Sequence, residues 1–477
     1  MDFLSRWRAA AAPPPRRVRK KFCRVTTYLV KRSAAGCRSD GQGLMSLSFA
    51  PLFFFSTVGA AVGGEWAYLG GQTEECSAAT DLRCGGVFPP SEQQWPGARC
   101  CAHVWAEPDS SPYAFVWGGY GYDGNGTLSY LNDLWRLHMP SMTWEFLGGS
   151  TVGNSDGGAH WPAARSYAPY AFDESTSSFY IFSGRGGSKD KYLQDLWRLD
   201  TRNFTWTRLG EHSPQPTPRW WSNFWAVPTR LYIQGGETDS GSGTLNDMWY
   251  YEYAKESWVQ VQDRPPNATA YGVYTGAVQY PGERHNAFTT SYNGSLYMFG
   301  GSGYGDKAHG YGVIQDLWRF DVSQNRWTFV GGNPGAVELH GTCGEAGVRS
   351  VSYLPTARHA GANFDFPIRG SKMLVLAGEH HPGPQDPKGS PELLMFNDLW
   401  SVDLEVPAQG WAFEGGTCNV PNVPNATRGN PGQGSRAYTP QSRYGGNGWH
   451  DGASAAWYFG GGYTGYTSDV WRFAWGE

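Results

Sequence analysis

A charged pair recurs six times along this chain. An arginine closes each of six Pro-x-x-Arg sequences, and an aspartate opens each of six Asp-x-Trp tripeptides that follow. The arginines are Arg99, Arg165, Arg219, Arg284, Arg358 and Arg443. The aspartates are Asp133, Asp195, Asp247, Asp316, Asp398 and Asp469. A guanidinium group can form two parallel hydrogen bonds with a carboxylate, so the arginines could bind a carboxylate of a peptide or an acidic sugar. They could also pair with the aspartates of their own or a neighbouring repeat, and the one-to-one count favours this second interpretation.

Aromatic residues and histidines stand beside several of these arginines. Trp220 and Trp221 follow Arg219, and Tyr444, His285 and His359 each come directly after an arginine. Tryptophan at such positions could stack on sugar rings or pack against neighbouring loops. We treat the six arginines and these five residues as candidate ligand-binding residues.

Histidines could also hold a metal ion, because imidazole is a common ligand of transition metals. His380 and His381 follow one apolar run, and His285 and His359 follow arginines of different repeats. Their irregular spacing favours solvated loop histidines, so we expect no metal ion and no other cofactor. The sequence also shows neither a Ser/His/Asp nucleophile elbow nor a phosphate-binding glycine loop.

The charged pair belongs to a repeat that predicts four short β-strands. An apolar run ending in small residues, such as LYMFGG at 296–301, separates the arginine from the aspartate. A second tryptophan follows the first by nine residues in four copies. Strand a is expected from the arginine, strand b over the apolar run, strand c from the aspartate and strand d around the second tryptophan. Four-stranded units repeated radially form a β-propeller.

The two ends of the chain complement each other. The sixth repeat stops after strand c, whereas EWAYLGG at 65–71 matches the strand d of 144–149 and precedes the first strand a. The sequence therefore predicts an all-β, six-bladed propeller that is closed by an N-terminal strand completing the last blade.

The repeat resembles the kelch repeat. Its marks are glycines after strand b, then Asn/Gln-Asp-Leu-Trp and a tryptophan about nine residues later, over roughly residues 65–477. The Asn-Asp-Leu-Trp form is similar to that of attractin and muskelin, within the superfamily of the galactose oxidase central domain. The resemblance implies a kelch propeller, a fold that hosts adaptors, receptors and a few enzymes. Galactose oxidase itself implies seven blades and a copper site, whereas six repeats are counted here.

The N-terminal 61 residues are typical of a basic leader followed by a signal peptide. Residues 1–43 hold 11 Lys/Arg, and the rest of the chain has a net charge of −13. The apolar segment at 44–64 ends in small residues, as in a secretory signal cleaved near Ala60, and residues 1–44 could be a gene-model extension. An uncleaved membrane anchor and an organellar or spurious leader are the alternatives. We expect one propeller domain over 62–477 and no nucleic-acid binding, because the basic excess lies outside it.

Cysteines and sequons favour an oxidising compartment. Cys76, Cys84, Cys343 and Cys418 lie in d–a loops, and we expect the disulfides Cys76–Cys84 and Cys343–Cys418. The alternative is a cytosolic protein with free thiols. Five Asn-x-Ser/Thr sequons are candidate glycosylation sites: Asn125, Asn203, Asn267, Asn293 and Asn425.

The long loops are expected on one face, between strands d and a and between strands b and c. Loops on a rigid scaffold usually carry recognition. We therefore expect a secreted or cell-surface, non-catalytic, monomeric module that binds a protein or glycan partner through this d–a/b–c face. A carbohydrate-active enzyme, such as a sugar epimerase or oxidase, and an intracellular kelch adaptor remain alternatives. Membrane association is expected only if the leader is an uncleaved anchor.

Overall fold

The computed structural model describes residues 64–476 apart from 79, 92, 108–110, 211–212, 240–242, 266–267, 335–340, 382–392 and 453. They belong to one compact unit, Gly59–Glu477. The predicted leader and signal peptide (1–61) and the sequon at Asn267 lie outside the described residues. Across the described part of the chain, no helix is both long and apolar enough to cross a bilayer.

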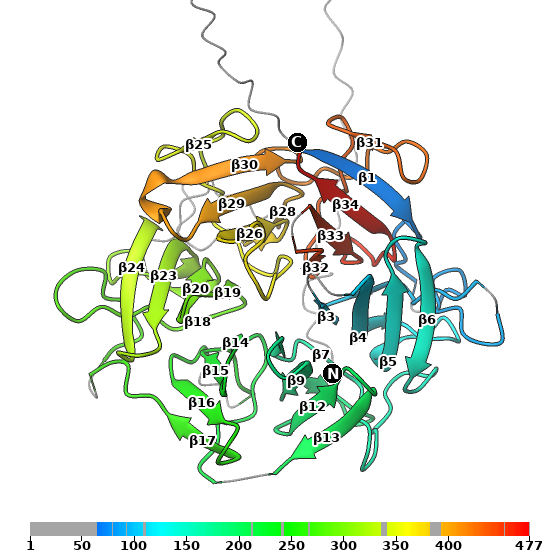
Figure 1. Ribbon diagram of the computed structural model, residues 1–477, viewed down its shortest axis with the longest axis horizontal. Coiled ribbons are helices and arrows are strands. Elements are labelled where there is room, and N and C mark those ends of the chain that lie inside the picture. The colour runs from blue at the N-terminus through cyan, green and yellow to red at the C-terminus, as the bar shows by residue number, and fades with distance from the viewer. Residues whose placement is uncertain are drawn as a thin grey trace, which may run out of the picture. The chain divides into compact units, whose positions relative to one another are not determined.

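The described residues form an all-β structure, as the sequence predicts, and their only helix is the short 3-10 helix η2 (Pro407–Gln409). Each repeat supplies one main antiparallel sheet, and repeats two, four and five each add a small second sheet (Figure 1). Repeats one to three contribute β3 (His103–Ala106), β4 (Tyr113–Tyr122), β5 (Leu128–His138) and β6 (Thr143–Gly148); β8 (Tyr170–Asp173), β9 (Ser178–Phe182), β12 (Leu196–Asp200) and β13 (Thr205–Leu209); and β14 (Asn223–Val227), β15 (Arg230–Gln234), β16 (Met248–Glu252) and β17 (Ser257–Gln260).

Repeat four follows the same plan, with β19 (Phe288–Tyr292), β20 (Ser295–Phe299), β23 (Gln315–Asp321) and β24 (Arg326–Asn333). Repeat five contributes β26 (Lys372–Leu376), β29 (Leu399–Asp403) and β30 (Trp411–Gly415), and repeat six contributes β32 (Asn447–His450), β33 (Ala455–Phe459) and β34 (Val470–Ala474). The short strands β25 (Arg349–Ser350) and β31 (Gly434–Ser435) pair at the outer edges of these two sheets, with β30 and with β1 (Glu65–Gly70). Short strands extend the hairpins: β2 (Arg99–Cys100), β7 (Arg165–Ser166), β10 (Arg185–Gly186), β11 (Lys191–Tyr192), β18 (Arg284–His285), β21 (Ser302–Tyr304), β22 (Tyr311–Val313), β27 (Glu379–His380) and β28 (Leu394–Met395).

Strand a begins later than the sequence predicts. Arg99, for example, precedes β3 and lies in the separate short strand β2. The residue two positions after each of the six arginines has a left-handed backbone, with φ between 54° and 58°. This conformation interrupts an extended strand, so the inner strand of the sheet starts only after it.

Backbone hydrogen bonds connect successive repeats at these left-handed residues. The amide of one residue donates to the carbonyl of its counterpart in the preceding repeat: Trp221 to Tyr167 (2.9 Å), Asn286 to Trp221 (2.7 Å), Ala360 to Asn286 (3.2 Å) and Gly445 to Ala360 (2.7 Å). The Cys101 amide donates to the Gly445 carbonyl at 2.7 Å, which joins the first repeat to the last. The inner strands also follow one another, since β3 contacts both β8 and β32, and β14 contacts both β8 and β19.

In repeats two to six, the glycine that ends the apolar run makes a second link between repeats. In the last repeat, the Gly461 amide donates to the Arg99 carbonyl at 2.9 Å. Gly461 has a φ of 95°, and a Cβ atom there would lie 2.9 Å from the Tyr444 carbonyl oxygen. Glycine is therefore required because the two backbones approach closely in a left-handed conformation.

The hydrophobic core lies between neighbouring sheets. Trp105 of β3 stacks on Phe179 of β9, with ring centroids 4.2 Å apart, so the first two repeats share one cluster. The N-terminal strand β1 (Glu65–Gly70) pairs antiparallel with β34, and Trp66 lies opposite Phe473 (Figure 1). Residues from the two ends of the described chain thus share one sheet.

Candidate ligand-binding site

The six predicted arginines are completely buried and bind within their own repeats. Arg99 donates to both carboxylate oxygens of Asp133, at 2.8 and 2.7 Å, and to the carbonyls of Gly97 and Gly118. The Trp135 indole donates to Asp133 at 2.6 Å. The same Arg–Asp pairing occurs in the other repeats: Arg165–Asp195, Arg219–Asp247, Arg284–Asp316, Arg358–Asp398 and Arg443–Asp469. All six arginines have 0 % of their surface exposed, so the geometry corresponds to the second interpretation of the sequence, in which they pair internally.

The Arg165–Asp195 ion pair remains charged over the ordinary pH range. Burial alone would raise the pKa of Asp195, but the Arg165 guanidinium lowers it to about 2. The carboxylate therefore accepts hydrogen bonds from both Arg165 and the Trp197 indole, the latter at 2.6 Å. The recurring Arg and Asp-x-Trp elements thus hold each sheet in register rather than present charge to a ligand.

A cavity of about 110 Å³ lies beside the six left-handed residues. Segments from all six repeats line it, including Cys101, Tyr167, Trp221, Asn286, Ala360 and Gly445. Because each of these residues comes just after a d–a loop, the cavity lies on the predicted d–a/b–c side. Non-glycine residues in the left-handed region are uncommon and often occur at functional sites. The cavity is therefore the best candidate for a binding site.

The polar groups of the cavity are acidic or neutral. Glu379 and Asp365 line it, and burial raises the pKa of Asp365 to about 7. Burial lowers the pKa of His103 to about 3, so this imidazole is neutral at physiological pH. Among the described residues that line the cavity there is no lysine or arginine. The lining is better matched to a cationic or neutral ligand group than to the carboxylate expected for an arginine rim.

Aromatic side chains form one wall of the cavity. Trp221 stacks on Trp220 with ring centroids 4.3 Å apart and on His285 at 5.4 Å. Tyr167 packs edge-on against Trp221 at 5.2 Å. Trp221 lines the cavity, whereas Trp220 is 7 % exposed and lies behind it. The structure thus brings together both predicted tryptophans and His285, but leaves only Trp221 accessible from the cavity.

The remaining predicted site residues lie at the same end. Tyr444 lines the cavity, and burial raises the pKa of its phenol well above the ordinary value. His359 is buried, and its ring centroid is 6.1 Å from that of His285. Sequence reasoning missed Tyr167, Glu379 and Asp365. The position two residues after each arginine would have indicated Tyr167, whereas nothing in the repeat marks Asp365.

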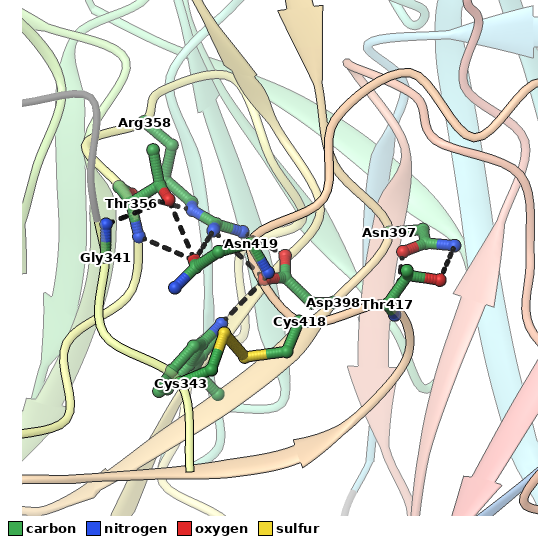
Figure 2. Close-up of a disulfide and its surroundings, with 10 residues drawn as sticks. Gly341, Cys343, Thr356, Arg358, Asn397, Asp398, Thr417, Cys418 and Asn419 are labelled. Carbon is green, nitrogen blue, oxygen red and sulfur yellow. Dashed lines mark hydrogen bonds and ion pairs between the residues drawn. A yellow bond between two sulfur atoms is a disulfide. The ribbon is translucent and has the colours of Figure 1, made fainter.

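The structure places both predicted cysteine pairs at disulfide distance. The Cα atoms of Cys76 and Cys84 are 6.1 Å apart, and those of Cys343 and Cys418 are 6.0 Å apart. Figure 2 shows the Cys343–Cys418 pair beside Asn419, and the backbone amide of Asn419 donates to the Asp398 carboxylate at 2.9 Å. The Asn419 side-chain oxygen accepts a hydrogen bond from Arg358 at 3.3 Å. This disulfide therefore holds a loop of repeat six against the ion pair of repeat five.

The sequons and the other two cysteines are placed as follows. Cys100 and Cys101 are free, and their sulfur atoms are 3.0 Å apart. The asparagines of the four described sequons are exposed: Asn125, Asn203, Asn293 and Asn425. Each of these four asparagines is thus accessible to a modifying enzyme.

Comparisons with known proteins agree with this architecture. Residues 111–279 match the family model described as the KLHDC2/KLHL20/DRC7 Kelch-repeats domain. Kelch domain-containing protein 3 of Bos taurus is 26% identical over 225 residues, which cover 45% of this chain and 50% of that protein. Kelch domain-containing protein 10 of Xenopus tropicalis is 21% identical over 300 residues, which cover 52% of this chain and 66% of that protein. The chain spans about half the length of the first of these relatives.

Fold and comparisons together support a kelch-repeat β-propeller. The finer likeness to attractin and muskelin rests on the Asn-Asp-Leu-Trp sequence alone.

Proposed function

We propose that this chain is a non-catalytic kelch propeller that binds a protein partner at the cavity on its d–a/b–c side. The observation that carries the proposal is that segments of all six repeats meet there, with Tyr167, Trp221 and Tyr444 in the lining. Tyrosine and tryptophan dominate binding energy in protein interfaces. The kelch relatives support a protein-binding module. The six arginines are buried and paired with aspartates, so we place the binding site at the cavity rather than at an arginine rim.

The acidic lining indicates the chemistry of the partner. Glu379 and Asp365 provide carboxyl groups that could bind a cation, and the rings of Trp221 and Tyr167 line the same cavity. We therefore propose that the partner inserts a segment with lysine or arginine side chains. A glycan partner, which the sequence left open, would use the same aromatic rings without this charge preference.

A displayed random-peptide library, selected on the immobilised full chain, tests this function. Basic peptides should be enriched, and Trp221→Ala should weaken their binding by about 2 kcal/mol, the effect of losing an interface hot spot. Tyr250→Ala is the matched control, because Tyr250 is a partly exposed aromatic residue outside the cavity. Enriched peptides that bind Trp221→Ala as well as wild type would contradict the site. Binding confined to a glycan array would contradict the protein partner.

We also propose that the six sheets are the six blades of one propeller and that β1 completes the last blade. The support is the pairing of β1 with β34 and the two hydrogen bonds that join the first repeat to the last, from Cys101 to Gly445 and from Gly461 to Arg99. A closed arrangement removes the sheet edges that an open one would expose.

Secretion is the proposed route of this protein. The two cysteine pairs at disulfide distance and the exposed sequons support it. Expression of the full chain in a eukaryotic host should give a product in the medium that lacks the leader up to about Ala60 and loses mass on treatment with an N-glycosidase. A full-length, unglycosylated product inside the cell would contradict secretion and favour the intracellular adaptor.

A further inference from the structure

We propose that His359, Glu379 and His381 form a binding site for a divalent transition-metal ion of the Zn²⁺ type. Their backbone positions bring the three side chains together. His359 and Glu379 exchange both backbone hydrogen bonds, from the His359 amide at 3.0 Å and from the Glu379 amide at 2.8 Å. In antiparallel strands, such residues lie directly opposite and present their side chains on the same face.

His381 joins this face because it lies two residues after Glu379. Side chains at i and i+2 of an extended chain point to the same side. The intervening His380 has a different environment, since its Nδ1 lies 3.0 Å from the carbonyl oxygen of Ala357. The sequence Glu379-x-His381, opposite His359, is therefore a local arrangement of two imidazoles and one carboxylate.

The spacing of the ligand atoms suits one metal ion. His381 Nε2 lies 3.4 Å and His359 Nε2 lies 3.7 Å from Glu379 Oε1. All three ligand atoms lie within 4.8 Å of one another. A tetrahedral Zn²⁺ with bonds of about 2.0–2.1 Å would hold its ligand atoms about 3.3 Å apart. The two distances to Glu379 Oε1 exceed this spacing by only a few tenths of an ångström at most, so small side-chain shifts would complete the site.

His359 supplies an independent indication of a ligand. The residue is only 4 % exposed, yet neither ring nitrogen has a hydrogen-bond partner among the described residues. The 3.7 Å separation from Glu379 is too long for a hydrogen bond. A buried polar group without a partner is costly, and a metal ion bound to Nε2 would remove that cost.

The site adjoins the cavity, because Glu379 also lines it. Two histidines and one carboxylate leave at least one coordination position of Zn²⁺ free for water or for a donor atom of a ligand. The ion would also place positive charge next to an otherwise acidic lining. This inference does not depend on the proposed protein partner.

Zn²⁺ titration of the full chain, after removal of metal with a chelator, tests the site. Calorimetry should show one ion bound per chain, and Zn²⁺ should raise the melting temperature because it binds the folded state. His381→Ala should weaken Zn²⁺ binding at least tenfold. The His381 side chain is 50 % exposed, so this variant should fold normally. His309→Ala is the matched control, since His309 is 51 % exposed and lies outside the site; it should bind Zn²⁺ as wild type does.

Glu379→Gln provides a second test, because it removes the charge and keeps the shape. It should also weaken Zn²⁺ binding at least tenfold. Absence of stoichiometric Zn²⁺ binding by the wild type would overturn the proposal. Binding that persists in both His381→Ala and Glu379→Gln but is lost in Cys101→Ser would assign the ion to the adjacent thiols instead.

Discussion

Arg99→Ala is expected to lower the free energy of unfolding by about 3–5 kcal/mol, the usual effect of removing one partner of a buried ion pair. Arg99 is fully buried, and the side chain of its partner Asp133 is 1 % exposed. The variant leaves the Asp133 carboxylate without its two strongest donors, at 2.8 and 2.7 Å, in a site that water cannot reach. Denaturant unfolding of the variant and the wild type, followed by tryptophan fluorescence, measures the difference.

The exposed pair Arg202–Asp200 provides a matched control. Its atoms are 2.8 Å apart, but the Arg202 side chain is 69 % exposed, so Arg202→Ala should leave the stability almost unchanged. An equally small effect of Arg99→Ala would contradict a structural role. Full stability of Arg99→Ala combined with lost ligand binding would restore the arginine rim as the binding site.

Much of the fold was accessible from the sequence because each repeat carries its own internal contacts. The aspartate of every Asp-x-Trp accepts hydrogen bonds from an arginine and from the tryptophan two residues later, as Asp316 does from Arg284 and Trp318. Contacts of this kind recur at constant spacing, so counting the repeats reveals them. The strand pairing of β1 with β34 also follows a repeated pattern, because Trp66 stands where the other repeats have their second tryptophan.

The binding site was less accessible because its residues do not repeat. The position two residues after the arginine has the same backbone in every repeat but carries a cysteine, a tyrosine, a tryptophan, an asparagine, an alanine and a glycine. The repeat constrains φ there, not the side chain, so no pattern of residue types marks the cavity. Glu379 was missed for a related reason, since its proximity to His359 arises from the pairing of two segments 20 residues apart.

Charge reasoning on the sequence could not distinguish a buried arginine from an exposed one. Six arginines at one end of the sheets suggest a basic surface, yet each is neutralised by an aspartate of its own repeat. The cavity lining carries two carboxyl groups instead, those of Glu379 and of Asp365, and burial raises the pKa of Asp365 to about 7. This agrees in sign with the net charge of −13 that the chain carries after residue 43, and it differs from the basic rim of the first interpretation of the arginines.

Trp66→Ala should destabilise the protein by about 3–5 kcal/mol, as large aromatic truncations in a core do. Trp66 is 1 % exposed and lies in the cluster between the last two sheets. Its ring centroid is 5.2 Å from that of Phe473 and 6.4 Å from that of Trp471, both on β34. The truncation leaves a cavity at the junction between β1 and β34, so it weakens the contact on which closure of the proposed six-bladed propeller depends.

Thermal or denaturant unfolding of Trp66→Ala measures this effect against Leu82→Ala. Leu82 is 79 % exposed, so its truncation should change stability by no more than about 0.5 kcal/mol. If Trp66→Ala unfolds together with the wild type, β1 does not complete the last sheet in solution, and β34 has an open edge. If instead the variant loses stability while Zn²⁺ binding at His359 and His381 persists, the damage is confined to the junction, because the proposed metal site lies in the preceding repeat.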